Sequence, residues 1–484
     1  MTTLDNAAGL EDADGLADVA DLTRSRFRTA APSAGGALPR IPRDQLPPGP
    51  RWPALVQTIA LMRLRHWFHP WLQRRYGDVY TVHLIPQSRP LVMVTRPEHT
   101  KEVFSGDPEQ FHAGKGNAIL GPIMGQHSLL LQDSIDHKRA RKLLMPPFNG
   151  AALREYEQMI SDLARAEVDR WSDGDTFRSL DRMNAVTLEV ILQVVFGVSD
   201  EQRLAALRPR VNATVDISPT VLLGWGYPFL QRFGVWKRTV DNQYELDRLM
   251  YAEIRERREA PDLAERGDVL SRLIRVGQEA AAEGRPEDAL SDVELRDQLV
   301  TLLLAGHETT ATALAWTLHE LGRHPELHAR SVAAARRDGV DAAEGDAWLD
   351  AVLKEALRLH PVIPMVVRTL QAPATIAGYD LPAGTTVGPS IVVTHQRSEL
   401  YPDPEVFRPD RFLGQNPPPN TWIPFGGGAR RCIGAGFSLM EGVAVLREVL
   451  TRFDVEAVGE DEPKVRNITS VPRRGARIRV RARA

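Results

Sequence analysis

The single cysteine of this chain, Cys432, stands in a segment that could activate it chemically. Three glycines precede it at positions 426–428, Arg430 and Arg431 lie just before it, and Gly434 follows. Glycine lets a backbone approach another group closely, and nearby positive charge lowers the pKa of a thiol, so a thiolate is expected here. A lone cysteine is more often a buried apolar side chain, whereas a thiolate acts as a nucleophile or a metal ligand. No histidine and carboxylate signature of a nucleophile surrounds Cys432, which favours the ligand.

A second polar cluster interrupts the most apolar part of a long helical pattern. Gly306, Glu308, Thr309 and Thr310 follow three leucines and an alanine at positions 302–305. A buried, unpaired carboxylate costs several kcal/mol and glycine inside a helix costs about 1 kcal/mol, so these residues need a compensating role. The residues alone allow two interpretations: a polar kink satisfied by water and back-bonded hydroxyls, or the polar wall of a site.

The helix that carries this second cluster is predicted to be unusually long. Ser291 and Glu294 form a capping box at its start, and Pro325 ends the pattern. The predicted helix over residues 291–323 therefore has about 32 residues and a length of roughly 48 Å, enough to cross a whole domain.

The rest of the chain reads as mainly helical. Apolar positions recur at helical spacing through most of residues 151–350, whereas short strand-like runs occur at residues 80–85 and 90–95 and beyond Pro361. We predict a mainly α protein with a small β-rich lobe. We expect one domain over residues 39–484, preceded by a mobile tail over residues 1–38.

The composition excludes several classes of protein. The chain has 484 residues, 60 basic and 63 acidic, so it offers no general positive field for nucleic acid. One cysteine excludes an intramolecular disulfide and an all-cysteine metal site, which favours a reducing cytoplasm. The best apolar stretch, residues 54–62, is far short of the ~20 residues that span a bilayer, so we expect no transmembrane anchor.

The segment from Phe425 to Gly434 resembles, position for position, the haem-binding loop of the cytochrome P450 superfamily, Phe-Gly-x-Gly-x-Arg-x-Cys-x-Gly. Three further segments are similar to motifs of that family and occur in its order: residues 305–310, 355–358 and 407–412. The resemblance covers about residues 40–484. It implies the cytochrome P450 fold, with the long central helix over a haem.

The resemblance also implies which residues hold the cofactor, haem b. Cys432 is expected to be the axial ligand of the iron, with Phe425, Gly426 and Gly434 shaping the loop around the sulfur. Two haem propionates need cationic partners, because carboxylates are costly to bury alone. By resemblance these partners are His137, Arg141, Arg368 and Arg430.

Two other groups of residues take roles from the resemblance. Glu308 and Thr309, with Ala305 and Gly306 beside them, are expected to be the catalytic acid and alcohol that support O2 activation. Glu355, Arg358 and Arg411 are expected to form a buried structural network that holds the loop of Cys432. An ion pair three residues apart on a helix would otherwise be a solvated surface pair.

The implied reaction is insertion of one oxygen atom from O2 into a lipophilic small molecule of terpenoid, steroid, fatty acyl or polyketide type. Apolar residues proposed to line the substrate pocket are Ile119, Ile123, Met124, Val362, Ile363 and Met365. The glycine-containing apolar segment 222–229 could be a mobile lid, or a membrane or partner surface.

Electrons are expected from separate partners, a ferredoxin and an NAD(P)H ferredoxin reductase, because a chain with no other cysteine cannot carry its own iron–sulfur centre. Two alternatives stay open. A member of the same family could catalyse oxidative coupling, desaturation or ring formation with the same iron chemistry, or the chain could be a non-enzymatic haem sensor.

Overall fold

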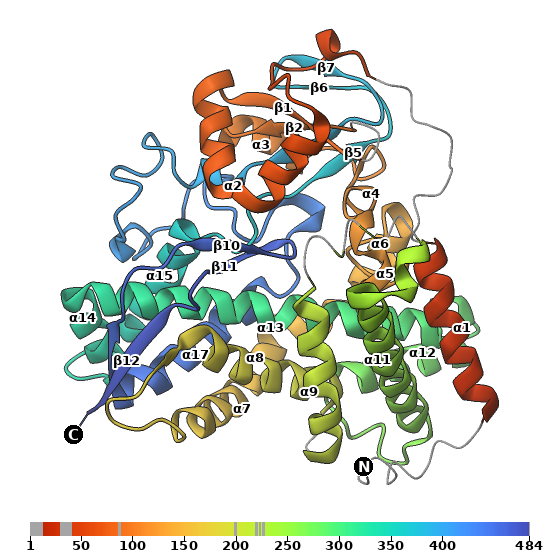
Figure 1. The fold of residues 1–484 in the computed structure, drawn as a ribbon. Coiled ribbons are helices and arrows are strands. Elements are labelled where there is room, and N and C mark those ends of the chain that lie inside the picture. Colours follow the sequence, from red (N-terminus) through yellow and green to blue (C-terminus); the bar gives the residue numbers. More distant parts are fainter. Residues whose placement is uncertain are drawn as a thin grey trace. The chain divides into compact units, whose positions relative to one another are not determined.

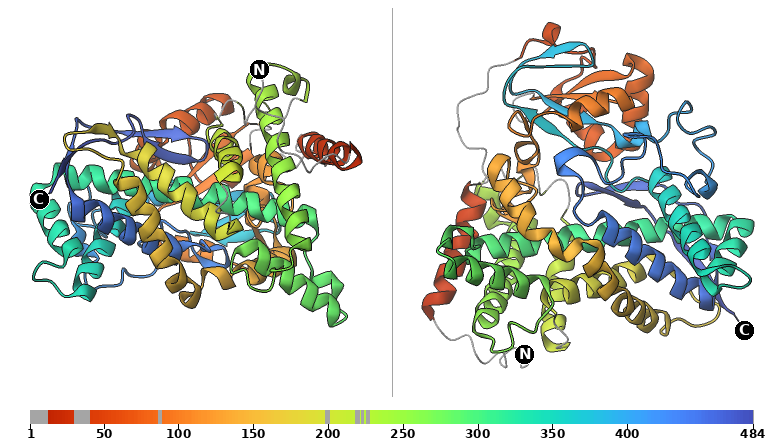
Figure 2. Two further views of the ribbon diagram at one scale, coloured as in Figure 1. Left: turned by 90° about the horizontal axis from the view of Figure 1, so that it is seen from below. Right: turned by 180° about the vertical axis from the view of Figure 1, so that it is seen from behind.

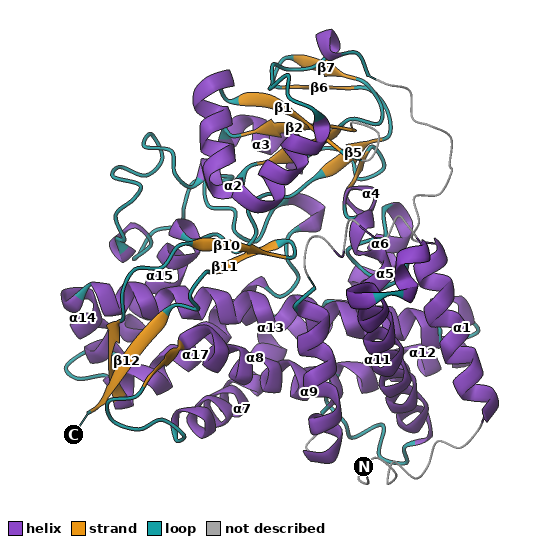
Figure 3. Ribbon diagram, viewed as in Figure 1, coloured by secondary structure: helices purple, strands orange, loops and turns teal. Residues whose placement is uncertain are grey.

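The computed structural model describes residues 13–29, 41–85, 89–197, 201–217, 221, 224 and 228–483. Helices make up most of these residues and the strands are short, as predicted (Figure 3). The chain folds into two compact units. The first unit comprises Met1–Ala37, Asn117–Gln132 and Ile191–Leu304, and the second comprises Leu38–Gly116, Asp133–Val190 and Ala305–Ala484.

The first unit is helical (Figure 1). Its elements are α1 (Ala13–Thr29), η2 (Ala118–Leu120), α5 (Gly121–Met124), α9 (Glu201–Val215), η4 (Pro228–Arg232), α11 (Gly234–Glu259), α12 (Val269–Ala282) and η5 (Pro286–Asp288). An apolar cluster of Phe27, Leu120, Ile123, Met124, Ile217 and Val221 forms part of its core. These side chains come from segments far apart in the sequence, so their burial fixes the unit's tertiary arrangement.

Helix α1 differs from the mobile tail expected over residues 1–38. Val19, Thr23 and Phe27 recur every four residues, lie on one face of the helix and are buried. Acidic residues are frequent in this segment, so the sequence does not make this short stripe of buried residues evident. Packing against α5 and α11 stabilises the helix. The other residues of the expected tail, 1–12 and 30–38, lie outside the described residues, as does most of the predicted lid at 222–229.

The second unit contains the remaining helices (Figure 1). They are η1 (Arg43–Gln45), α2 (Ala54–Tyr76), α3 (Pro97–Phe104), α4 (Ala113–Gly116), α6 (Ser134–Leu144), η3 (Pro146–Phe148), α7 (Gly150–Val168), α14 (Pro325–Arg336), α15 (Ala342–Leu359), α16 (Ile391–Thr394), η6 (Pro409–Arg411), η7 (Gly428–Arg430) and α17 (Ala435–Arg452). Two long helices continue from one unit into the other, α8 (Ser179–Phe196) and α13 (Asp292–Arg323). Helices α7, α14 and α15 pack around α17 (Figure 2).

The strands of the second unit form four small sheets. The largest has the order β1-β2-β8-β5-β3, from β1 (Val79–Leu84), β2 (Arg89–Val94), β8 (Thr386–Pro389), β5 (Arg368–Leu370) and β3 (Phe111–His112). The others are β4 (Thr176–Arg178), β12 (Arg477–Ala482) and β9 (Phe453–Ala457), the hairpin of β6 (Ala374–Ile376) and β7 (Tyr379–Leu381), and the hairpin of β10 (Pro463–Arg466) and β11 (Thr469–Pro472).

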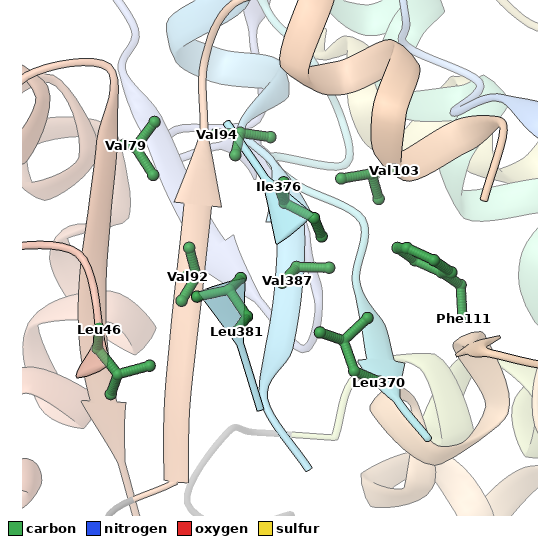
Figure 4. Close-up of a cluster of buried hydrophobic side chains, with 10 residues drawn as sticks. All are labelled: Leu46, Val79, Val92, Val94, Val103, Phe111, Leu370, Ile376, Leu381 and Val387. Atoms are coloured by element: carbon green, nitrogen blue, oxygen red, sulfur yellow. The ribbon is translucent and has the colours of Figure 1, made fainter. Parts of the chain in front are cut away.

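One face of the largest sheet is closed by an apolar cluster. Figure 4 shows Val92 and Val94 of β2 beside Val387 of β8 and Leu370 of β5, with Phe111 of β3 nearby. Strands β2 and β8 are parallel and pair Val92 with Val387, although about 290 residues separate them in sequence. Arg368, the first residue of β5, pairs with Val387 of β8 and is held in this sheet.

The long helix is confirmed almost to the residue. Helix α13 has 32 residues, and the Ser291 backbone N–H donates to Glu294 Oε2 (2.8 Å), while the Glu294 N–H donates to Ser291 Oγ (3.3 Å). Pro325 begins the next helix, α14. Among the described residues no single helix is long and apolar enough to cross a membrane, and one sharply bent pair, α8 with α9, passes the same test by length and composition.

Candidate functional site

The loop that carries Cys432 is shaped by its backbone. The Cys432 N–H donates to Phe425 O (2.9 Å), closing a turn in which Gly426 and Gly428 have φ values of +66° and +65°. A side chain on Gly428 would place a Cβ 2.0 Å from the carbonyl oxygen of Phe104. Only glycine permits this left-handed conformation and this close packing, so the glycines fix where the sulfur lies.

The positive charges beside Cys432 are present, but they do not dominate its titration. Burial raises the pKa of the thiol, whereas the Gly434 backbone N–H and the charges of Arg431 and Arg141 lower it by less. The Cys432 side chain is itself exposed, so this opposing effect does not decide its charge, and the thiolate stays a prediction. A metal cation bound to the sulfur would supply the missing stabilisation, since a coordinating thiol is deprotonated.

A cluster of cations belongs to the same unit. His137 on α6 and Arg368 at the start of β5 are both buried, and burial together with Arg430 and Arg141 lowers the pKa of His137 to about 4. Burial lowers the pKa values of Arg368 and Arg430 to about 10. Burial is the main cause of these shifts, and mutual repulsion among the arginines adds to it.

Asp133 is the acid that faces this cluster. Its Oδ1 accepts from Arg430 Nη2 (2.6 Å) and from the Gly114 backbone N–H (2.9 Å). His137 is neutral near pH 7, but one carboxylate cannot balance the three arginines Arg141, Arg368 and Arg430, so the cluster suits an additional anionic group.

Haem fits these residues. A Cβ built on Gly434 would meet no protein atom within 4 Å, and one on Gly426 would meet only Val366 Cγ1 at 3.7 Å, so there is open space beside the thiol. The sulfur of Cys432 suits iron, and the cation cluster suits two propionate carboxylates. One unit thus contains the three arginines, the histidine and the cysteine expected to hold the cofactor.

On α13 an accessible strip interrupts an otherwise buried helix. Ala305 is exposed and Gly306 and Thr309 are half-buried, whereas residues 310–321 are buried. Thr309 Oγ1 donates to Ala305 O at 2.8 Å, so its hydroxyl is satisfied by back-bonding within the helix. The helix continues without a break through this strip, and the hydroxyl keeps a free acceptor side.

Glu308 is buried and turns toward the hairpin of β10 and β11. Its Oε1 lies 3.5 Å from Arg466 Nε and accepts from Thr469 Oγ1 at 3.3 Å. Sequence reasoning missed Arg466, because no local pattern links a β-turn residue to a helix more than 150 positions earlier. Arg466 gives Glu308 a charged partner that the sequence-based account of this carboxylate lacked.

The predicted network of Glu355, Arg358 and Arg411 is present. Arg358 makes two hydrogen bonds to the carboxylate of Glu355, at 2.7 and 2.8 Å, and both side chains are fully buried. Arg411 Nε donates to Glu355 Oε1 at 3.3 Å. Further bonds from these arginines reach backbone carbonyls at residues 395 and 402–406, so the network organises the segment that precedes the Cys432 loop.

His395 connects this network to the loop and was not anticipated from the sequence. Its carbonyl oxygen accepts from Arg358 Nη1 (3.0 Å), and its Nε2 accepts from the Ile423 N–H (2.9 Å), two residues before Phe425. Burial lowers the pKa of His395 to about 3, so the ring is neutral and Nε2 is available as an acceptor.

The residues proposed to line the substrate pocket fall into two groups. Ile119, Ile123 and Met124 belong to the first unit, where the latter two are buried and Ile119 is 40% exposed. Val362, Ile363 and Met365 belong to the second unit. Ile363 and Met365 pack against buried core clusters there, which favours a core role for these two.

Comparison with known proteins identifies the family to which this chain is related. The family profile described as Cytochrome P450 matches residues 47–479. Cytochrome P450 135A1 of Mycobacterium tuberculosis is 49% identical over 438 residues, covering 90% of this chain and 95% of the relative. Cytochrome P450 137 of the same species is 36% identical over 490 residues, covering 99% of each chain.

Solved structures show the same fold. The retinoic acid-bound cyanobacterial CYP120A1 aligns with a TM-score of 0.77 at 24% identity, covering 90% of this chain and 99% of that one. The haem domain of cytochrome P450DA aligns with a TM-score of 0.76 at 25% identity, covering 90% and 98%. With its cysteine loop, its cation cluster and these matches over most of its length, the chain belongs to the cytochrome P450 family of haem-dependent monooxygenases.

Proposed function

We propose that this enzyme binds haem b and uses O2 and externally supplied electrons to hydroxylate or epoxidise a lipophilic small molecule. The observation that carries the proposal is the single cysteine in a glycine-shaped loop that shares a unit with Arg141, Arg368, Arg430, His137 and the acid Asp133. When bound, the haem iron supplies O2 binding and O–O bond cleavage, favoured by electron donation from a thiolate.

The protein's own residues then have distinct tasks. Cys432 Sγ holds the iron, and His137, Arg141, Arg368 and Arg430 neutralise the propionates. The fully buried Glu355–Arg358 pair and His395 hold the backbone from which the loop starts.

Proton delivery is proposed to involve the polar groups on α13. The carboxylate of Glu308, which accepts from Thr469 and pairs with Arg466, is proposed to take up protons and pass them on near the helix. The Thr309 hydroxyl, which donates its one proton to Ala305 O in this structure, is proposed to turn from that carbonyl, pass its proton to a reactant in the open strip and take up a replacement proton on its acceptor side.

Electron supply is proposed to come from a ferredoxin and its NAD(P)H reductase. Arg431, next to Cys432, is exposed and suits an acidic protein surface. We propose that the enzyme acts in the reducing cytoplasm, because its single cysteine can form no intramolecular disulfide bond. A lipophilic substrate is proposed from the apolar character of the residues that the family resemblance assigns to the pocket.

The test is the carbon monoxide difference spectrum of the reduced holoenzyme. We expect the strongly red-shifted Soret band of thiolate-ligated haem. The variant Cys432→His should move that band to the position typical of imidazole ligation. A wild-type protein that takes up haem but lacks the thiolate band would contradict the proposal. Spin-state shifts across a panel of terpenoids, steroids and fatty acids then identify the substrate class.

A further inference from the structure

The turn between β10 and β11 places two partners beside Glu308, the buried carboxylate on α13. Arg466 Nε lies 3.5 Å from Glu308 Oε1, and the Thr469 hydroxyl shares its one proton between that oxygen (3.3 Å) and Arg466 O (2.6 Å). Arg466 and Thr469 face each other in the register of the hairpin, and only residues 467 and 468 join them. The conformation of this two-residue turn therefore sets where both partners of Glu308 lie.

Arg65 on α2 holds the turn by its two carbonyl groups. Its Nη1 donates to Ile468 O (2.9 Å), and its Nη2 donates to Asn467 O (3.3 Å). These two residues lie outside the paired register of the hairpin, so strand pairing does not satisfy their carbonyl oxygens. The planar fork of a guanidinium binds both oxygens at a fixed spacing, which a single ammonium group does not. Arg65 therefore restrains the conformation of the turn.

The guanidinium of Arg65 is buried, and its hydrogen bonds go to this turn. The residue is 6% exposed, and burial lowers its pKa to about 10. Among the residues that the structure describes, its Nε has no hydrogen-bond partner, and no acid offsets the cost of burying its charge. Burying an arginine in this way is costly, and the two bonds to the turn offset part of that cost. Holding the turn is thus the task that the position of Arg65 gives it.

The next residue of α2 holds the adjoining part of the hairpin. His66 Nε2 lies 2.8 Å from Ser470 Oγ, and the Ser470 N–H donates to Val362 O at 2.8 Å. Helix α2 is kinked at Leu64 (φ −125°, ψ 23°), directly before Arg65 and His66. Figure 1 shows the hairpin of β10 and β11 between α2 and α13. Two consecutive side chains of α2 thus tether the turn and the start of β11, and all of these residues belong to the second unit.

We propose that Arg65 is a positioning residue for Glu308. Arg65 fixes the turn, the turn places Arg466 and Thr469, and these two hold the Glu308 carboxylate in the orientation from which it passes protons. The inference deepens the proposed function and rests on it, because it takes Glu308 as the group that takes up protons. The hydrogen bonds of Arg65 in the described structure reach the turn and not the residues expected to hold the haem. Loss of Arg65 should therefore disturb proton delivery and leave haem binding intact.

The first measurement compares Arg65→Met with the wild-type holoenzyme. It uses NADPH, a ferredoxin with its reductase, and the compound that gives the largest spin-state shift in the panel of terpenoids, steroids and fatty acids. We expect product formed per NADPH consumed to fall about fivefold, with a matching rise in peroxide, because Glu308 is no longer held in place. The ratio of haem to protein and the carbon monoxide band should stay as in wild type. Arg65→Lys, which keeps the charge and one donor group, should restore part of the coupling.

A double-mutant cycle separates this role from general loosening of the fold. If Arg65 acts through Glu308, Arg65→Met should lower coupling in the wild-type background and change it by less than about 1.5-fold in the Glu308→Gln background. Hydrogen–deuterium exchange of the holoproteins needs no turnover, and we expect the amides of residues 466–470 to exchange faster in Arg65→Met. Arg63→Met is the matched control, because Arg63 is an exposed arginine of the same helix, and it should keep wild-type coupling and exchange.

Three results overturn the proposal: unchanged coupling in folded Arg65→Met, an equal fall in coupling when Arg65→Met is added to Glu308→Gln, or an equal effect of Arg63→Met. If Arg65→Met does not fold, Arg65→Gln, which is too short to span the two carbonyls, replaces it in the same cycle. Failure of the proposed function is seen separately, as a wild-type protein without the thiolate-type carbon monoxide band or as wild-type coupling in Glu308→Gln.

Discussion

Thr309 and Thr317 are two threonines of α13 in the same local bond but in different surroundings. Each hydroxyl donates to the carbonyl oxygen four residues earlier, Ala305 or Ala313, at 2.8 and 2.7 Å. Thr317 is fully buried, whereas Thr309 is half-buried beside the exposed Ala305. The buried hydroxyl of Thr317 therefore has a structural role, whereas the hydroxyl of Thr309 is accessible to a reactant.

Substitution of Thr309 should therefore affect coupling. In Thr309→Ala we expect product formed per NAD(P)H consumed to fall about tenfold, because the hydroxyl that moves protons is removed. Thr309→Ser should retain most of the coupling, and Thr317→Ala should retain all of it. The measurement is product yield against NAD(P)H oxidation, with peroxide assayed in parallel. Unchanged coupling in Thr309→Ala would refute the role.

Glu441 on α17 is expected to make the stability of the fold depend on pH. It is 1% exposed, and burial raises its pKa well above the ordinary value, opposed in part by Thr310. The folded protein therefore holds a proton that the unfolded chain releases above its ordinary pKa of 4.5. The stabilising contribution is complete below that pH and is lost as the pH rises.

The variant Glu441→Gln should gain stability at high pH. The amide keeps the shape without the ionisable proton, so we expect a higher urea midpoint than wild type at pH 8 and no advantage at pH 4. Glu448→Gln on the same helix is the control, because Glu448 pairs with Arg165 near the surface at 3.2 Å. An equal midpoint for wild type and Glu441→Gln at pH 8 would show that Glu441 is not held as the neutral acid.

Among the elements, α15 supports the cofactor loop indirectly. Arg358 donates to the carbonyl oxygens of residues 404 and 406, and Glu355 accepts from the Arg408 N–H. His395 links this network to the Ile423 N–H. The Cys432 loop contains little regular secondary structure, so its position depends on these hydrogen bonds. Losing one partner of a buried ion pair costs about 3–5 kcal/mol, more than losing a surface pair.

Removal of Glu355 should consequently release the cofactor. We expect Glu355→Ala to be purified with a small fraction of the wild-type haem content, because Arg358 and Arg411 lose their shared carboxylate. The measurement is the ratio of haem to protein. Glu399→Ala is the control, since Glu399 is an exposed partner of Arg397 at 3.0 Å. Normal haem content in Glu355→Ala would refute the supporting role.

For the whole molecule, buried neutral histidines set the response to acid. Burial lowers the pKa values of His69 and His395 to about 3, from an ordinary 6.5. Below pH 6.5 the unfolded chain takes up protons that the folded chain cannot, so stability falls as the pH falls. Shifts of this size correspond to a few kcal/mol in each case.

Unfolding by urea at several pH values checks this expectation. We expect the midpoint to fall steeply between pH 6.5 and pH 4, with haem released in the same range as the His395 to Ile423 bond is lost. His69→Gln, which removes one titrating group but keeps a polar partner for Tyr80, should flatten the decline. A midpoint independent of pH over this range would contradict the assignment of neutral histidines.

Short-range patterns in the sequence were enough to predict those parts of the site whose residues lie close together along the chain. The glycines around Cys432, the capping box of α13 and the spacing of Glu355 and Arg358 all act over short distances along the chain. Local sterics and hydrogen bonds decide such features, and the family resemblance extended them to the cation cluster.

The sequence by itself therefore determined the family and the long helix, and it predicted the ligand cysteine, because the motifs behind them act over short distances along the chain. Only the tertiary structure decided which distant groups meet: Arg466 with Glu308, His395 with Ile423 and α1 with α5. The sign of the pKa shift of Cys432 was also a tertiary result. Burial decides these outcomes, and it depends on how the whole chain packs rather than on the residues next to each group.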